Sequence, residues 1–393
     1  MFPVFLKTRK ALRAAALTLT CSVALAACTV PSDIAGGGPS INASRPVPVA
    51  LLLPYGTEIA NQTGLARSLE NAARLAIADL NGVTIDLKVY ATAGNAEQAA
   101  VVAQEAVGDG AKIILGPVFS AAANAAGVAA ARANINVLSF SNNTDIAGGN
   151  VFVLGNTFEN TARRVVSYAA QQGSGNVFVA YPQTSVGTVG RDAILQAVAE
   201  TGATAAGSIG YEASQTGVVN AVPQIASALR SSGATALVMT DDTSGSIPLL
   251  SQLLPENGID PASTQFVGLT RWDIPASSLA LPGLQGGIFA LPDPALSAQF
   301  ADRYQATYGA PPHPIAGLAY DGIAAIGALV STQQSRALTG AALTQGSGFA
   351  GVTGAFRLRA DGTNERALAV ARITNQAVTI VSPAQRSFGV GGS

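Results

Sequence analysis

The chain has 393 residues, 48% of them hydrophobic and 11% charged, and its formal net charge is −1. No Lys- or Arg-rich run occurs after residue 28, so the sequence lacks the basic surface that nucleic-acid binding needs, and no nucleic-acid partner is expected. One histidine, His313, and two cysteines are too few for a His/Cys zinc site. His313 stands among prolines, a poor place for the general base of a catalytic triad. We therefore expect no metal, no cofactor and no enzymatic activity.

The first 27 residues are laid out like a secretory signal. Four basic residues lie between positions 7 and 13, and the apolar run 14–27 carries no charge. That run is too short to cross a hydrocarbon core of about 30 Å as a helix. It ends in Leu-Ala-Ala before Cys28, a tetrad that resembles the bacterial lipobox, and the resemblance implies cleavage before Cys28 and lipidation of its thiol. The alternative is an ordinary signal peptide with a chance cysteine.

Residues 28–46 are rich in Gly, Pro and Ser, and we expect them to form a lipidated, flexible tether. Beyond them, apolar runs typical of buried strands alternate with amphipathic helices. Val47–Leu53 is a continuous apolar run, and 64–80 carries apolar residues at helical spacing on one face. The same pattern predicts strands at 83–90, 112–115, 135–140, 176–181, 204–211, 235–240 and 265–270, and helices at 95–107, 121–132, 158–171, 188–200, 218–230 and 245–254.

This alternation determines the predicted fold. Strands separated by helices of this length imply βαβ units and parallel sheets, and the strands are too many for one comfortable sheet. The fold class is therefore α/β, with two doubly wound parallel-sheet lobes. Ligands of such sheets bind beyond the carboxyl ends of the strands. The candidate cleft residues at these positions are Tyr55, Ser120, Ser141, Asn142, Asn143, Tyr181, Trp272 and Asp273. Individually, the serines and asparagines could instead cap helices or turns.

Two other motifs have a structural interpretation. Asp241 and Asp242 are adjacent carboxylates with no further ligands nearby, so we interpret them as charges at a helix N-terminus rather than as a metal site. Residues 346–351 match G-x-G-x-x-G, but no strand leads into them and a strand, not a helix, is predicted at 352–358. We therefore expect a flexible loop there.

Several segments in order resemble the type I periplasmic solute-binding proteins of the leucine-binding-protein family. They are the strand and helix from Val47 to Leu80, the turn Gly116–Ser120, the strand end at Val137–Ser139, Phe300–Gly309, Ala319–Gly322 and Gly351–Gly362. The resemblance implies a ligand cleft between two lobes joined by crossovers near 154–158, 287–292 and 344–350. It assigns 47–155 plus 290–345 to lobe 1, and 156–289 plus 346–393 to lobe 2.

The sequence departs from the amino-acid binders of that family. They hold the carboxylate and ammonium of the ligand with a Ser turn, an Ala-Thr turn, an aromatic residue and an acid. Ser120 matches the Ser turn, but Asn142 and Asn143 replace the Ala-Thr pair, and Trp272–Asp273 lie near the acidic position without a clean match. The expected ligand is therefore uncharged or not an α-amino acid.

A group with the same fold, the lipoprotein activators of penicillin-binding proteins, is similar in its lipobox, its tether, the turn at 139–143 and Arg163–Arg164. This resemblance implies a class A penicillin-binding protein, a peptidoglycan synthase, as partner. Thr29, where an aspartate would retain a lipoprotein at the inner membrane, implies a periplasmic protein anchored by lipid to the outer membrane. The alternative is the substrate-binding protein of an ABC importer, with a permease partner and a small polar or amino-acid-like solute.

Overall fold

The structure is a computed structural model that describes residues 37–57, 59 and 62–389. The predicted signal, Cys28 and the first part of the tether lie outside the described residues. A five-stranded parallel sheet, in the order β2-β1-β3-β4-β5, forms the first lobe. Its strands are β1 (Val47–Leu53), β2 (Ile85–Ala91), β3 (Ile113–Leu115), β4 (Val137–Ser139) and β5 (Val151–Val153).

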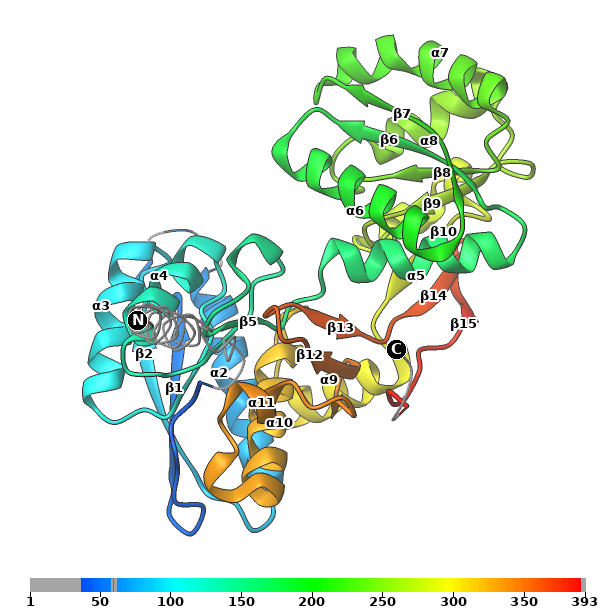
Figure 1. The fold of residues 1–393 in the computed structure, drawn as a ribbon. Helices are drawn as coiled ribbons and strands as arrows, with labels where there is room; N and C mark the ends of the chain where they lie inside the picture. Colours follow the sequence, from blue (N-terminus) through cyan, green and yellow to red (C-terminus); the bar gives the residue numbers. More distant parts are fainter. Residues whose placement is uncertain (1–36, 58, 60–61, 390–393) are drawn as a thin grey trace, which may run out of the picture. The chain divides into compact units, whose positions relative to one another are not determined.

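Helices cover both faces of this sheet because the side chains of a strand alternate between faces. On β1, Leu51 and Leu53 pack in the core that includes α2 (Gln62–Asp79) and α10 (Gly317–Gln333). Ala50 and Leu52 face the core that includes α3 (Ala96–Gly108) and α4 (Ser120–Ala131). Burial on both faces explains the continuous apolar run of β1. Figure 1 shows α3 and α4 on one side of the sheet and α2 and α10 on the other.

The second lobe is a seven-stranded sheet in the order β15-β14-β10-β9-β8-β6-β7. Its strands are β6 (Asn176–Pro182), β7 (Thr204–Tyr211), β8 (Ala236–Met239), β9 (Gln265–Gly268), β10 (Ile288–Leu291), β14 (Ala369–Thr374) and β15 (Ala377–Ser382). β6 to β10 pair in parallel, and β14 and β15 add an antiparallel edge. Its helices are α5 (Phe158–Gln171), α6 (Ser185–Thr201), α7 (Gln215–Ser232) and α8 (Ile247–Glu256). The predicted α/β fold with two doubly wound lobes is confirmed.

The other described elements are a third, small sheet and further helices. A small antiparallel sheet consists of β11 (Phe349–Gly351), β12 (Gly354–Leu358) and β13 (Asn364–Arg366), and the other α-helices are α9 (Pro294–Tyr308) and α11 (Gly340–Leu343). Short 3-10 helices occur at Thr144–Ile146, Ala276–Ala280, Pro282–Leu284 and Gln334–Arg336. Within the described residues, no helix is both long and apolar enough to cross a membrane.

Three details differ from the sequence-based expectations. Residues 37–46 of the predicted tether are docked on the first lobe, because Ile41 is buried in its core and the Ile41 amide donates to Ser335 O at 3.1 Å. The expected loop at 346–351 ends in strand β11. The third passage between lobes comes after Arg366 and not at 344–350, because Phe349, Phe356 and Leu358 are buried in the core of the first lobe.

Candidate functional site

The carboxyl ends of β3, β4 and β5 meet at one edge of the first sheet, and a cavity of about 460 Å³ opens there. Its lining brings together four of the predicted cleft residues, Ser120, Ser141, Asn142 and Asn143. The other lining residues are Val118, Phe119, Phe140, Gly155, Asn156, Ile315 and Leu318. We call this cavity the first-lobe pocket. Its lining contains neutral polar and apolar side chains and no charged one.

The two turns that form the pocket are joined by hydrogen bonds. Pro117 O, after β3, accepts from the Phe140 amide and from Ser139 Oγ, both at 3.0 Å. Gly116 makes the close approach that the first turn needs: its φ is +88°, and a Cβ there would lie 2.3 Å from Leu52 O. Ser141 O in turn accepts from the Gly155 amide at 3.0 Å, which connects the β4 and β5 turns. The backbone of the pocket is therefore held in place before any ligand arrives.

The N-terminus of α4 faces this pocket through Phe119 and Ser120. Phe119 is the N-cap residue and makes no side-chain capping hydrogen bond. The first N–H groups of an α-helix have no partner within the helix, and the helix dipole adds partial positive charge there. An uncapped helix start beside hydroxyl and amide side chains fits a carboxylate or a neutral polar group.

Asn156 is a pocket residue that the sequence analysis did not identify. Its Nδ2 donates to Thr161 Oγ1 at 3.0 Å, while its Oδ1 is buried with no partner among the described residues. A buried acceptor without a partner costs free energy, which a ligand donor could recover. Its position just after strand β5 could have identified it from the sequence as a candidate cleft residue. The apolar Ile315 and Leu318 carried no such signal, because only folding brings them to the pocket.

Three other candidates, Tyr55, Tyr181 and Asp273, lie away from the first-lobe pocket, and their polar groups are already engaged. Tyr55 O–H donates to Glu70 Oε2 at 2.9 Å, and burial followed by this hydrogen bond raises the pKa of Tyr55 well above its usual range. Tyr181, at the end of β6, accepts from Arg191 Nη1 at 3.1 Å. Asp273 pairs with Arg271, whose Nε lies 2.9 Å from Asp273 Oδ1.

Trp272 corrects an expectation. Its side chain is fully buried in the core of the second lobe, where it supports the backbone of Gly268 and Gly287. A Cβ added at Gly268 would lie 2.5 Å from the indole, and one added at Gly287 would lie 2.6 Å from it, both too close for non-bonded atoms. The indole therefore has no surface to offer a ligand, and Trp272 is a core residue.

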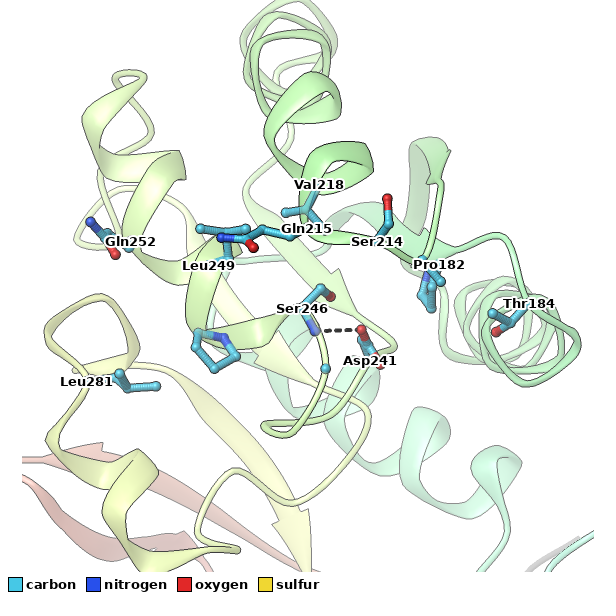
Figure 2. Close-up of a pocket in the computed structure, with 13 residues that line it drawn as sticks. Pro182, Thr184, Ser214, Gln215, Val218, Asp241, Ser246, Leu249, Gln252 and Leu281 are labelled. Carbon is cyan, nitrogen blue, oxygen red and sulfur yellow. Dashed lines mark hydrogen bonds between the residues drawn. The ribbon is translucent and has the colours of Figure 1, made fainter.

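A second cavity, of about 630 Å³, lies in the second lobe between α7 and α8 (Figure 2). Asp241 points toward it and accepts from the Ser246 amide at 2.7 Å, as the dashed line in Figure 2 shows. Asp242 Oδ1 accepts from the amides of Ser244 and Gly245, both at 2.8 Å. The two carboxylates thus accept hydrogen bonds from the backbone amides of the turn before α8. In the described part of the chain, no three His, Cys, Asp or Glu side chains gather as metal ligands.

Comparison with known proteins decides the family. A family model described as periplasmic binding protein matches residues 46–377. The chain belongs to the periplasmic binding protein family. A search of curated proteins finds no match.

Solved periplasmic binding proteins share the fold. A putative branched-chain amino acid ABC transporter protein from Rhodospirillum rubrum is 18% identical, with a TM-score of 0.73 over 86% of this chain and 100% of that one. A substrate-binding protein from Desulfitobacterium hafniense, solved with Leu, is 16% identical, with a TM-score of 0.63 over 86% and 100%. A solute-binding protein from Rhodopseudomonas palustris BisB5, solved with 3,4-dihydroxybenzoic acid, is 16% identical, with a TM-score of 0.59 over 87% and 97%. The expected type I solute-binding fold is confirmed.

Proposed function

We propose that this periplasmic binding protein acts by recognition and not by catalysis, as an activator of a class A penicillin-binding protein in cell-wall synthesis. The supporting geometry begins with His313, the single histidine. Its Nδ1 accepts from the Ile315 amide at 3.4 Å, and burial lowers its pKa. A ring nitrogen engaged by the backbone is poorly placed to take a proton from a nucleophile.

The observation that carries the activator role is the state of the groups that would hold an amino acid's ammonium. Asp273 is paired with Arg271, Trp272 is buried, and Tyr181 accepts from Arg191. An ammonium brought to such a site would lose water without gaining an ionised partner, at a cost of about 1.5–3 kcal/mol for each missing charged hydrogen bond. The lipobox at Cys28 and the neighbouring Thr29 support a protein anchored to the outer membrane, on the side where a synthase works.

A second candidate is the solute receptor of an ABC importer. The first-lobe pocket favours it, because the uncapped start of α4 next to Ser120 fits a carboxylate. Leu and 3,4-dihydroxybenzoic acid, present in two of the solved relatives, both carry one. In this role the ligand would be a carboxylic acid without an ammonium group, and the partner would be a permease.

Two measurements on the purified chain separate these roles. In the first, glycan polymerisation by a class A penicillin-binding protein is followed with and without the chain, and we expect the chain to increase the rate. In the second, thermal unfolding is followed with leucine, 3,4-dihydroxybenzoate and muropeptides. A ligand at 100 times its dissociation constant would stabilise the chain by about 2.7 kcal/mol. Such a shift, together with an unchanged polymerisation rate, would replace the activator role by the receptor role.

A pair of variants locates any ligand that binds. Ser120→Asp places a carboxylate at the start of α4 and should abolish the shift caused by a carboxylate ligand, because like charges repel there. Ser185→Asp makes the same change at the start of α6, on the other lobe, and should leave the shift unchanged. Equal shifts in both variants would show that the ligand binds elsewhere.

A further inference from the structure

A third cavity, of about 390 Å³, shares no residue with the first-lobe pocket. It lies where α5, the passage after β13 and the segment after β15 come together, and Figure 1 shows α5 near β14 and β15. Its polar lining includes Arg163, Arg164, Arg366, Ser167, Gln171 and Ser382. We call it the arginine pocket. Three arginines line this one cavity, in a chain with 11% charged residues and a net charge of −1.

Most charges at the arginine pocket are already compensated. Arg163 pairs with Glu200 at 2.8 Å, and Arg366 pairs with Asp321 at 3.0 Å. Glu365, the one acidic residue of the lining, is held by two arginines outside the cavity, Arg357 and Arg359, at 2.7 Å and 3.0 Å. None of these pairs leaves a negative charge to neutralise a further cation.

Arg164 is that further cation. Its Nε donates to Leu368 O at 2.7 Å, and its Nη2 donates to Ser382 Oγ at 2.6 Å. All of its acceptors are neutral, and within the described residues no carboxylate lies within 4.0 Å of it. Its Nη1 donates to no atom of the described part of the chain. Burial lowers the pKa of Arg164, which reflects the cost of holding this charge away from water.

We propose that the arginine pocket binds a small oxyanion, a phosphate or carboxylate group, with Arg164 as its principal charged contact. Nη1 of Arg164, which has no partner within the described residues, leaves its two N–H groups free to donate to oxygens of such a group. Two of the Arg164 nitrogens are fixed by Leu368 and Ser382, so the side chain is held in place before the anion arrives. Arg163 Nη1, which makes no hydrogen bond within the described residues, supplies a second donor from the same helix. This site is independent of both roles proposed above.

Calorimetric titration of the purified chain with sodium phosphate, and separately with sodium acetate, tests the proposal. We expect saturable binding of at least one of them, at one site per chain. Binding of phosphate alone identifies a phosphate site, and binding of acetate alone a carboxylate site. The affinity should fall between about 0.01 M and about 0.15 M sodium chloride, where the Debye length shortens from about 30 Å to about 8 Å.

Variants assign the binding to the pocket. Arg164→Gln should weaken it about tenfold or more, because a charge-assisted hydrogen bond is lost. Since Arg164 also anchors Leu368 and Ser382, a second variant, Ser167→Asp, adds a repelling charge to the lining and leaves that anchor in place. It should weaken binding to a similar degree. Arg132→Gln removes an exposed charge next to α4 and is the matched control.

Two results would overturn the proposal. One is the absence of heat with both anions at low salt. The other is an affinity that is the same in Ser167→Asp, Arg132→Gln and the unaltered chain, which would show that the anion binds elsewhere.

Discussion

Replacing Asp321 by Asn should destabilise the protein by about 3–5 kcal/mol, the usual cost of removing one partner of a buried ion pair. The pair joins α10 to β13: Asp321 Oδ2 lies 3.0 Å from Arg366 Nη1. The side chains of Asp321 and Arg366 are 0% and 5% exposed. Without the carboxylate, the guanidinium would stay buried with no counter-charge.

The lost carboxylate charge acts in two ways, through the hydrogen bonds that it accepts and through the buried cation that it leaves unpaired. An asparagine oxygen at position 321 can still accept from the Val352 amide, now 2.7 Å from Asp321 Oδ1. What it cannot replace is the ionised oxygen that accepts from Arg366 and from Thr353 Oγ1 at 2.8 Å. A hydrogen bond to a charged group contributes about 1.5–3 kcal/mol, and the unpaired buried cation adds the rest.

Urea unfolding followed by circular dichroism measures the effect. With a slope of about 3 kcal/mol per molar urea for a chain of this size, the midpoint should fall by roughly 1 M or more. Asp302→Asn, an exposed position on α9, serves as the control and should leave the midpoint unchanged. The double replacement Asp321→Leu with Arg366→Met should recover much of the loss, because it removes both charges together. An Asp321→Asn midpoint equal to that of the control would refute the reasoning.

Three further outcomes are expected. At Glu365, burial by itself raises the pKa, but hydrogen bonds from two arginines outweigh burial and lower the pKa below 4.5. The resulting stability is present above pH 4.5 and is lost as the pH falls through the folded-state pKa. Glu365→Gln should therefore flatten the dependence of the unfolding free energy on acid pH, and parallel curves for the variant and the unaltered chain would contradict this. Gly116→Ala should lower the free energy of unfolding by about 3 kcal/mol or more, because the new Cβ would lie 2.3 Å from Leu52 O and the φ of this residue is +88°. Thermal unfolding measures the effect, and a near-native melting temperature would argue against the strain. Tyr211→Phe should cost about 1–3 kcal/mol in urea, since the buried Ser246 hydroxyl loses its partner at 2.6 Å, and Tyr181→Phe, whose ring is partly exposed, should cost less.

The sequence by itself predicted the fold class, because each parallel strand carries its own evidence of burial. The run at 47–53 is apolar on both faces, and its alternate residues pack in two different cores. Helix 158–171 was predicted with the bounds that α5 has in the structure, since its apolar face and its cap residue, Thr157, are local features. The pocket residues Ser120 and Ser141–Asn143 followed from one rule, that ligands of such sheets bind at strand ends.

Only the tertiary structure decided which of those candidates lie together and which are engaged elsewhere. Trp272 follows a strand as a cleft residue would, yet its indole fills the core under Gly268. Strands β5 and β13 have three residues each, too few to show a period of their own, and form only because a neighbouring strand, β4 or β12, offers its hydrogen-bonding edge. Arg164 and Arg366 are far apart in sequence and meet at one cavity because the chain passes three times between its lobes. Burial and charge pairing depend on such distant partners, which periodicity along the chain does not record.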